Sequence, residues 1–418
     1  MRSRRPFRTC AAGVLLVVVC LAPRAVVADS YKLINEPSGN DNAQNPTSGR
    51  WLTGYYPSYQ ESLMPPSEID YTALTHLIHW PVLPRPDGTL DPETFGMTPE
   101  QSQTIVSGGH AAGIKVLLGI GGDTESGATA GFRAATTAAN RAKFVTNIVN
   151  LMQSRQYDGV DINWEDLRTQ DRANFTAFFR RLRSALNRIV PRPLLTMPPA
   201  TSLGDNVTPR LVGRVQGQLD QVNIQTYVMS GPYDGWVTWF NSPLHDGGFT
   251  FPSTGGPVPS IDMLVNSFVN AGVPRSKIAI GIQFDGAVWA GGSGTDTGGV
   301  TKPRQSWTTA PTVDYLRYAD IVTSFTAAQG FQAFFDEVTG EPWLSLDDAA
   351  NDANDRFVSY DDAEAIHQKA LYLQSENLQG AFIFEITGDY LPNNPAEQQH
   401  PLLSAAKTYI KDEFVNAP

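Results

Sequence analysis

Short apolar runs alternate with amphipathic stretches along most of this chain. Between the runs, hydrophobic residues recur at helical spacing, as in the series Phe175, Phe178, Phe179 and Leu182. Buried strands that alternate with helices predict an α/β fold, either a (β/α)8 TIM barrel or a doubly wound open sheet. Eight repeats favour the barrel. The apolar runs are Trp51–Tyr56, Leu74–Trp80, Lys115–Ile120, Gly159–Asn163, Leu194–Met197, Val222–Tyr227, Ile278–Phe284 and Ala381–Ile386.

One connection between runs is much longer than the others. It contains a helix-like stretch over Tyr315–Ala327 and a hairpin-like stretch with a turn near Thr339 and Gly340. A segment of this length is too long for a simple loop in a compact domain. We therefore predict a small α+β insertion over residues 287–356, after the seventh strand of the barrel.

The first 28 residues have a different character from the rest. An arginine-rich head precedes an apolar run from Ala11 to Ala22, and small residues stand just before Asp29. This is the pattern of a secretory signal peptide, and the apolar run is too short to span a bilayer. We expect a secreted, extracellular protein with a signal peptide over residues 1–28, a polar tail over 29–50 and the barrel domain over 51–415.

The composition and the net charge of the chain exclude some classes of binding partner. Hydrophobic residues make up 41% of the chain and charged residues 17%, which is typical of a globular protein. Removal of the leader would take away five arginines and no acids, and would shift the formal net charge from −11 to −16. Such a surface repels nucleic acid and anionic lipid. We expect a monomer with a neutral substrate and with no nucleic-acid or membrane partner.

The sequence gives little sign of a metal or a cofactor. Both cysteines, Cys10 and Cys20, lie in the predicted leader, so the mature chain has no thiolate ligand. The six histidines are scattered, and the glycines of the stretch "GIGG" at 119–122 lack the spacing of a dinucleotide fingerprint. We expect neither a metal nor a cofactor.

The stretch "YDGVDINWED" at 157–166 places polar side chains inside the predicted barrel. Val160 and Ile162 alternate with Asp161, Asn163 and Glu165. Successive side chains of a strand point to opposite faces. The apolar pair should therefore face the helices, and the polar residues should face the C-terminal mouth, where barrel active sites lie. Buried carboxyl groups without a use are costly, so these residues are candidates for catalysis.

The pattern Asp158, Asp161, Asn163 and Glu165 at the end of the fourth strand resembles glycoside hydrolase family 18, the chitinases and their relatives. The resemblance extends along nearly the whole chain from residue 51, and it includes an α+β insertion after the seventh strand. Its other motifs are "GYY" (Gly54–Tyr56), "KVLLGIGG" (Lys115–Gly122), "VNIQTY" (Val222–Tyr227), "FVSYDD" (Phe357–Asp362) and "GAFIFEITGD" (Gly380–Asp389).

The resemblance implies substrate-assisted hydrolysis of the β-1,4 bond that follows an N-acetylglucosamine unit. Glu165 would protonate the glycosidic oxygen, and the substrate's own acetamido carbonyl would act as the nucleophile. Tyr227 would donate a hydrogen bond to that carbonyl, beside Asp161 and Asn163. A tyrosine that only packs in the core is the alternative interpretation of Tyr227.

The resemblance also implies a sugar-binding cleft for chitin or an N-acetylglucosamine oligosaccharide. Tyr55 and Phe384 would line the subsite next to the cleaved bond, and Trp236 is a further candidate for stacking that is equally well explained by packing. Asp158 has the wrong parity for the mouth, but Gly159 beside it permits a kink that would turn it inward. The remaining substrate-binding candidates are Gly121, Gly122 and Gln225.

Asn163 is the most consequential departure from the family, because it stands where the family usually has a third Asp. An amide can still orient an acetamido group, but it carries no negative charge. Losing one group that stabilises a transition state commonly costs about 2.7–4 kcal/mol. We therefore predict a slow enzyme, or one in which neighbours such as Asp161 compensate.

Other departures indicate a remodelled cleft. Asp123 and Phe384 stand where Trp is common, Val228 where Asp is usual, and Asp285 and Ala287 where Tyr and Arg are usual. Two alternative functions therefore remain open. One is an endo-β-N-acetylglucosaminidase that acts on N-glycans. The other is a chitinase-like lectin that binds sugar without cutting it, although a lectin of this kind usually lacks the glutamate that Glu165 retains.

Overall fold

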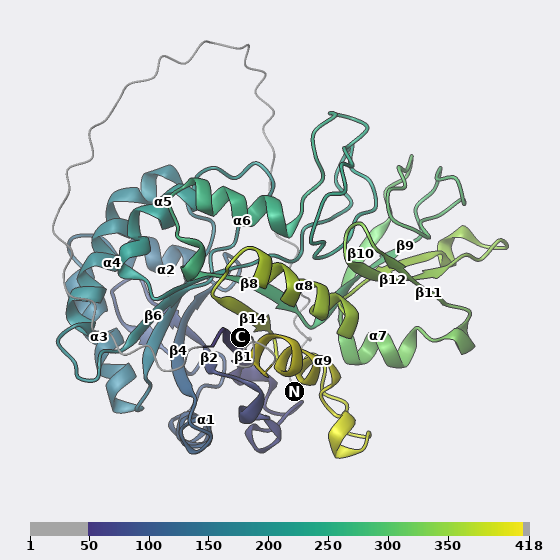
Figure 1. Ribbon diagram of the computed structural model, residues 1–418. Helices are drawn as coiled ribbons and strands as arrows, with labels where there is room; N and C mark the ends of the chain where they lie inside the picture. Colours follow the sequence, from purple (N-terminus) through teal and green to yellow (C-terminus); the bar gives the residue numbers. More distant parts are fainter. Residues whose placement is uncertain (1–48, 413–418) are drawn as a thin grey trace, which may run out of the picture. The chain divides into compact units, whose positions relative to one another are not determined.

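The computed structural model describes residues 49–412, and in it the predicted apolar runs form a closed parallel barrel (Figure 1). The strands pair in the order β1-β14-β8-β7-β6-β5-β4-β2, and pairing of β1 with β2 closes the ring. The predicted TIM barrel is therefore confirmed, and the open sheet is excluded. The barrel strands are β1 (Trp51–Pro57), β2 (His76–Pro84), β4 (Lys115–Gly122), β5 (Gly159–Trp164), β6 (Leu194–Met197), β7 (Gln221–Ile224), β8 (Ile278–Gln283) and β14 (Gly380–Phe384).

Helices connect the strands and cover the outside of the barrel. Their starts carry the expected signals: the Thr98 side chain accepts a hydrogen bond from the Gln101 amide with Pro99 next to it, and Ser260 caps its helix in the same way. A short strand β3 (Leu90–Asp91) pairs antiparallel with the end of β2. The helices are α1 (Pro99–Ala111), α2 (Ala128–Ala135), α3 (Arg141–Ser154), α4 (Arg172–Leu186), α5 (Thr208–Val215), α6 (Ile261–Asn270), α8 (Ala363–Ser375) and α9 (Pro401–Ala406).

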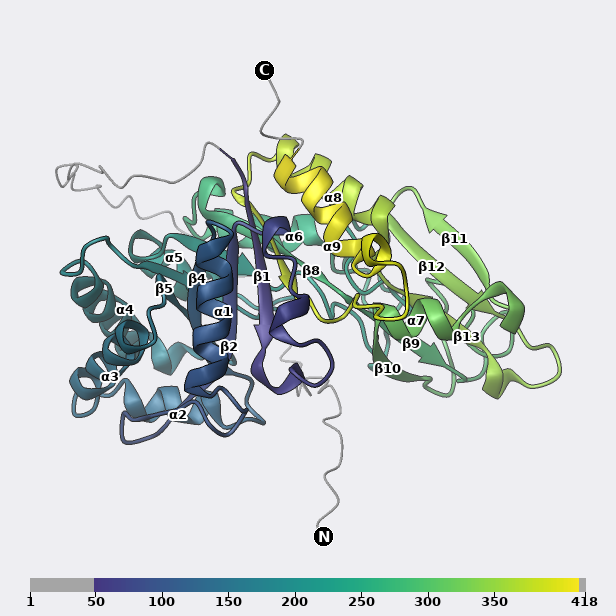
Figure 2. The same ribbon diagram turned by 90° about the horizontal axis from the view of Figure 1, so that it is seen from below.

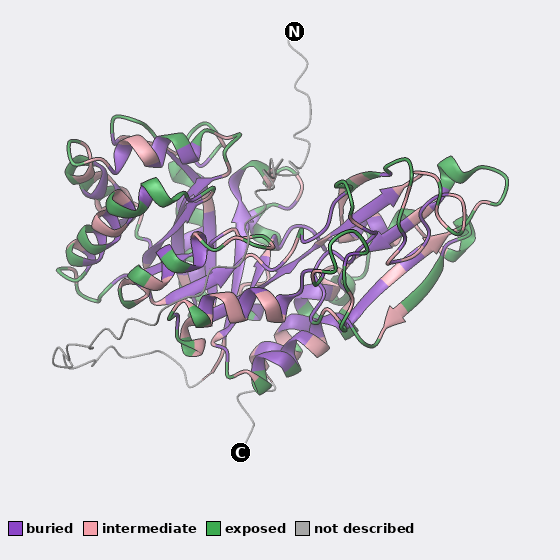
Figure 3. Cartoon of the chain, turned by 90° about the horizontal axis from the view of Figure 1, so that it is seen from above, coloured by how far each residue is buried: buried purple, intermediate pink, exposed green. Residues whose placement is uncertain are grey.

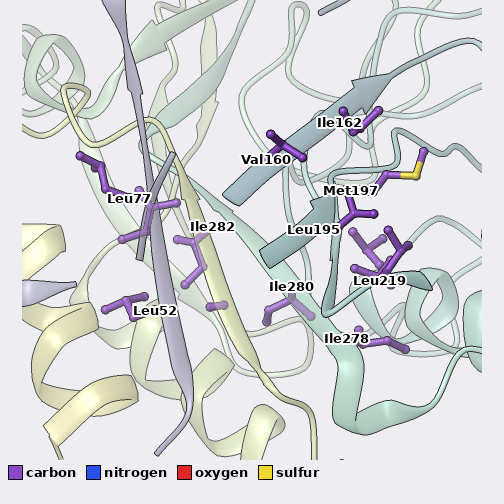
Figure 4. Close-up of a cluster of buried hydrophobic side chains, with 14 of the residues drawn as sticks. Leu52, Leu77, Val160, Ile162, Leu195, Met197, Leu219, Ile278, Ile280 and Ile282 are labelled. Atoms are coloured by element: carbon purple, nitrogen blue, oxygen red, sulfur yellow. The ribbon is translucent and has the colours of Figure 1, made fainter. Parts of the chain in front are cut away.

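Side chains on the two faces of the strands belong to separate hydrophobic clusters. Val160 and Ile162 of β5 lie in the large cluster between barrel and helices, with Leu195 and Met197 on the neighbouring strand (Figure 4). A smaller cluster fills the inside of the barrel; its fully buried members are Tyr55, Ile78, Leu117, Ala279 and Phe382. The alternation predicted for β5 is therefore observed: its apolar side chains face the helices.

A second sheet follows β8 and lies to one side of the barrel (Figure 2). Its antiparallel order is β10-β9-β13-β12-β11, and one helix accompanies it. Figure 3 shows that the barrel strands are buried along their length, whereas the outer strands of this second sheet are partly exposed. The elements are β9 (Asp285–Ala290), β10 (Thr312–Arg317), α7 (Tyr318–Ser324), β11 (Gln332–Asp336), β12 (Glu341–Leu346) and β13 (Arg356–Ser359).

The bounds of this insertion differ slightly from the expected range of residues 287–356. The sheet begins at Asp285 because β9 continues almost directly from β8, and it ends at Ser359. The hairpin-like stretch forms β11 and β12, and the Asp336 side chain accepts the backbone amides of Val338 and Thr339 in the turn. The helix is shorter than Tyr315–Ala327, since the first residues of that stretch pair in β10.

The predicted signal peptide over residues 1–28 and most of the polar tail over 29–50 lie outside the described residues. The last residues of the expected 51–415 domain also lie outside them. Within residues 49–412, no helix combines the length and the apolar character needed to cross a membrane.

Candidate active site

The polar side chains of β5 lie where the strand reaches the mouth of the barrel. Asp161 is fully buried, Asn163 is 5% exposed, and Glu165 follows the end of the strand and is partly exposed. Burial therefore decreases stepwise along this face of the strand. The outermost carboxyl group, that of Glu165, is the one that a ligand can reach.

Asp161 is held by hydroxyl groups from two other strands. The Tyr55 hydroxyl donates to its Oδ2 at 2.9 Å, and the Thr196 hydroxyl donates to its Oδ1 at 2.5 Å. Burial raises the pKa of Asp161 to about 7, and the two hydroxyl groups oppose this shift only in part. The carboxyl group is therefore largely protonated in acidic solution, unlike an ordinary aspartate.

Glu165 has the environment of a proton donor. Gln225 donates from Nε2 to its Oε1 at 3.2 Å, and the same nitrogen donates to the Pro198 carbonyl at 3.1 Å. Burial raises the pKa of Glu165, and the negative charge of Asp123 raises it further, while Gln225 and Asn163 lower it. Because the net shift is upward, Glu165 retains its proton at a higher pH than an exposed glutamate does.

Asn163 presents an unused acceptor at the mouth. Its Oδ1 is buried and has no hydrogen-bond partner among the described residues. A buried polar atom without a partner costs about 1–3 kcal/mol. The oxygen is therefore suited to accept an N–H group from a bound molecule.

Aromatic rings form one wall of the site. Tyr227 and Phe384 are nearly parallel, with ring centroids 6.2 Å apart and an interplanar angle of 21°. Tyr55 and Trp80 lie against Phe384 at 5.8 Å each. Burial, then the charge of Glu165 and of other nearby carboxyl groups, raises the pKa of Tyr227 well above its usual value. The hydroxyl therefore stays protonated and remains a hydrogen-bond donor.

Gly121 allows β4 to approach β5 closely at the mouth. Gly121 pairs with Asn163, and a Cβ atom at Gly121 would lie 1.9 Å from the Asn163 backbone oxygen. Gly121 also has a φ of +120°, a conformation that favours glycine. Gly121 therefore shapes the site through the backbone, since a larger residue would push Asn163 out of place, whereas a Cβ atom at Gly122 would meet the Ser126 hydroxyl at 3.0 Å.

Asp158 does not turn inward, and our expectation that it lines the mouth is wrong. Its carboxylate lies 3.0 Å from Lys115 Nζ and 2.9 Å from His110 Nε2, and it accepts the Val116 backbone amide. Lys115 and Val116 begin β4 and His110 lies in the last turn of α1, so these partners lie at the end of the barrel opposite the mouth. The Lys115 ammonium group and the hydrogen bonds from His110 and the Val116 amide satisfy the carboxylate there.

Trp236 is also not brought together with the other site candidates. It packs on Phe251 and Tyr233, with ring centroids 4.7 and 4.9 Å away. These contacts belong to a cluster that joins the loop after β7 to the second sheet. These contacts fit the alternative interpretation of Trp236 as a packing residue.

Two acidic residues near the site were not among the sequence candidates. Glu385 is 5% exposed directly after Phe384, and Asp285 follows β8. Both are among the carboxyl groups whose charges act on Tyr227. The sequence shows that Asp285 stands where the family usually has Tyr. Nothing in the sequence indicates that the side chains of Asp285 and Glu385 lie close together.

A separate groove on the outside of the barrel holds none of these groups. It runs along α4 between α3 and α5, and small residues of α4 are among those that line it. Because no carboxyl group lines it, it offers no acid for glycoside cleavage. Its basic lining residues are Arg141, Arg172, Arg180, Arg181, Arg188 and Arg214. No cluster of three or more potential metal ligands occurs in the described part of the chain.

A closed (β/α)8 barrel whose mouth holds a proton-retaining glutamate beside aromatic rings has the architecture of a glycosidase. Comparison with known families agrees with this class. The chain belongs to the glycosyl hydrolases family 18, whose family model matches residues 52–389.

Relatives of this chain include named chitinases and chitinase-like proteins. Chitinase A1 of Niallia circulans is 27% identical over 302 residues, which cover 66% of this chain and 41% of the relative. A chitinase-like effector of Moniliophthora roreri is 23% identical over 380 residues, covering 80% of this chain and 89% of the relative. The chain thus spans less than half the length of chitinase A1, but most of the effector.

Solved structures share the fold. The group IV chitinase of Ostrinia furnacalis in complex with allosamidin superimposes with a TM-score of 0.73 at 20% identity, over 86% of this chain and 98% of that one. A family 18 N-acetylglucosaminidase from Paenibacillus barengoltzii gives a TM-score of 0.64 at 24% identity, over 86% of this chain and 99% of that one.

Proposed function

We propose that this protein is a secreted glycoside hydrolase that cleaves chitin or chito-oligosaccharides at β-1,4-linked N-acetylglucosamine. Family membership and the chitinases among its relatives support the reaction class. The observation that carries the proposal is the environment of Glu165, a partly exposed glutamate with a raised pKa that accepts a hydrogen bond from Gln225 and lies close enough to Tyr227 for its charge to act on it. Secretion rests on the leader pattern of residues 1–28.

In the proposed reaction the protonated Glu165 gives its proton to the glycosidic oxygen as the bond from C1 to that oxygen breaks. The acetamido carbonyl oxygen of the same sugar attacks C1 and forms an oxazolinium ion. A water molecule then adds to C1, and the Glu165 carboxylate takes up its proton. The C1–O bond to the acetamido group breaks, so the product keeps the β configuration.

Two neighbours would orient the acetamido group. The Tyr227 hydroxyl, kept protonated by its surroundings, donates to the carbonyl oxygen that attacks. The unpaired Oδ1 of Asn163 accepts the acetamido N–H, which supplies the partner that this buried atom lacks. Because an amide cannot offset the positive charge of the oxazolinium, we expect turnover about 10²–10³-fold slower than with an aspartate there.

The direct test is release of dye from a chromogenic chitobioside by wild type and by Glu165→Gln. General acid catalysis contributes about 10²–10⁴-fold, so the variant should lose at least that much. Glu337→Gln, the same change at an exposed position in the turn of the second sheet, is the matched control and should keep full activity. Equal dye release by wild type and Glu165→Gln would overturn the proposal.

A chitinase-like lectin is the second candidate, favoured by Asn163 and by the similarity to a chitinase-like effector. A lectin would hold the sugar in the same cleft without cleaving it. Retention on chitin beads together with no dye release by wild type would establish this alternative. Dye release that depends on Glu165 would exclude it.

A further inference from the structure

Two carboxyl groups, those of Asp285 and Glu385, meet near Tyr227 at the mouth of the barrel. Strands β8 and β14 are neighbours, with Gln283 paired to Phe384. Asp285 lies two residues after Gln283, and Glu385 directly follows Phe384. The ends of adjacent strands therefore bring the two acids together, next to the aromatic wall.

Each acid of this pair has one oxygen without a partner. Glu385 Oε1 accepts hydrogen bonds from Gln60 and, at 3.2 Å, from Thr387. Asp285 Oδ2 has a long contact of 3.5 Å from Gln283 Nε2. Glu385 Oε2 and Asp285 Oδ1 are buried and have no partner among the described residues. Two acceptor oxygens are thus available at one place, which is costly unless a ligand uses them.

The nearby positive charge of Arg317 is shared between this pair and a third acid, Asp320. Arg317 lies opposite Asp285 in the β9–β10 ladder, but its guanidinium binds both oxygens of Asp320, at 2.8 and 2.9 Å. Burial raises the pKa of Asp285 to about 6, with Arg317 opposing the shift. Burial and the neighbouring Asp285 raise the pKa of Glu385 to about 8. The pair therefore lacks a cation that would balance it.

The surroundings of the pair favour an organic cation on a sugar ring. Tyr227 and Phe384 present nearly parallel rings beside it, and the apolar face of a sugar packs on such rings. Hard metal ions require six or more oxygen ligands or a carboxylate cage with several waters. No cluster of three potential metal ligands lies anywhere in residues 49–412. An ammonium group needs only a few acceptors, and this site offers two.

We propose that Asp285 and Glu385 form a subsite for the ammonium group of a glucosamine unit, so that the preferred substrate is partly deacetylated chitin. This proposal rests on the proposed function, because the reaction itself needs an acetamido group beside Glu165 and Asn163. The glucosamine unit therefore occupies the neighbouring position. Its ammonium group donates hydrogen bonds to the two free carboxyl oxygens and stabilises the ionised form of both acids.

Binding of two tetrasaccharides tests the proposal without turnover. The full chain carrying Glu165→Gln is titrated by calorimetry, at low salt, with the glucosamine tetramer and with the N-acetylglucosamine tetramer. We expect both to bind. Adding Asp285→Asn should lower the affinity for the glucosamine tetramer about tenfold or more, because a charge-assisted hydrogen bond is lost. The affinity for the N-acetylated tetramer should change by no more than about twofold. Glu385→Gln is the second variant and should act in the same direction.

Asp314→Asn, an exposed acid on β10, is the matched control and should change neither affinity. Binding of the N-acetylated tetramer alone would overturn the glucosamine subsite and leave the proposed function standing. Binding of neither tetramer would overturn both. Equal losses for both tetramers in Asp285→Asn and Glu385→Gln would show a general packing role and would also overturn the subsite.

Discussion

Replacement of Asp161 by asparagine should make the protein more stable relative to wild type as the pH rises, although it alters the site. The Asp161 carboxyl group is fully buried, and its two hydrogen-bond partners, Tyr55 and Thr196, are neutral hydroxyl groups. Burial therefore disfavours the charged form and raises the pKa of Asp161 to about 7. In the unfolded chain the group titrates near an ordinary value of about 3.9.

The sign and the size of the effect follow from proton linkage. Because the folded pKa is the higher one, the folded state keeps a proton that the unfolded state loses between about pH 4 and pH 7. Stability therefore falls as pH rises through this window and stays low above it. A folded pKa of about 7 against an unfolded pKa of about 3.9 corresponds to about 4 kcal/mol in full. About 2–3 kcal/mol of this falls between about pH 5 and about pH 8.

The assay is urea unfolding of wild type and Asp161→Asn at these two pH values. Asparagine does not titrate, so the free energy of unfolding of the variant relative to wild type should rise by about 2–3 kcal/mol from the lower to the higher pH. Any fixed cost of fitting an amide between the two hydroxyl groups cancels in this comparison. A difference between variant and wild type that does not change with pH would refute the reasoning.

Asp158→Asn is the matched control on the same strand. Burial acts to raise the pKa of Asp158, but the Val116 backbone amide, hydrogen bonds from His110 and Lys115 and the charge of Lys115 together lower it. A lowered folded pKa means that its stabilisation is complete above the unfolded pKa of about 4 and is lost only as pH falls further. This variant should therefore be less stable than wild type at both pH values, with no relative gain at the higher one.

Three further predictions concern the site and the leader. Asn163→Asp should raise kcat on a chromogenic chitobioside by up to about 10²–10³-fold by restoring a charge that stabilises the oxazolinium, and an unchanged or lower kcat would argue against that role. Tyr227→Phe should lower kcat about 10–100-fold by removing the hydroxyl that orients the acetamido carbonyl, and a loss confined to stability would leave Tyr227 as a packing residue. N-terminal sequencing of the protein exported from a bacterial host should begin at Asp29, whereas a start at Met1 would contradict the leader assignment.

Repetition and alternation along the chain were sufficient to predict the barrel. Each of the eight runs forms a strand, because a short apolar segment between two helices is buried on both faces in a parallel sheet that helices cover. Alternate side chains of a strand point to opposite faces, which places Asp161 and Asn163 on the inner face of the barrel. The long connection predicted the second sheet for the same reason, and its hairpin was visible from the turn at Thr339 and Gly340.

Side-chain partners that come from distant segments could not be predicted in this way. Asp158 was expected to turn inward, yet Lys115 and His110 hold it at the opposite end of the barrel. The meeting of Asp285 and Glu385 depends on the pairing of β8 with β14, which about 100 residues separate in the chain. Trp236 lies in a loop, and no periodic pattern indicates whether a loop aromatic packs or lines a cleft.

Proton NMR of a fresh digest of chitotetraose tests the central claim most directly, because it reads the configuration of the newly formed end before it equilibrates. The account places Glu165 and the substrate's own acetamido group on the reacting sugar, and it therefore predicts that the β anomer appears first and that Glu165→Gln yields neither anomer. Initial appearance of the α anomer, or the same products from Glu165→Gln as from wild type, would contradict it.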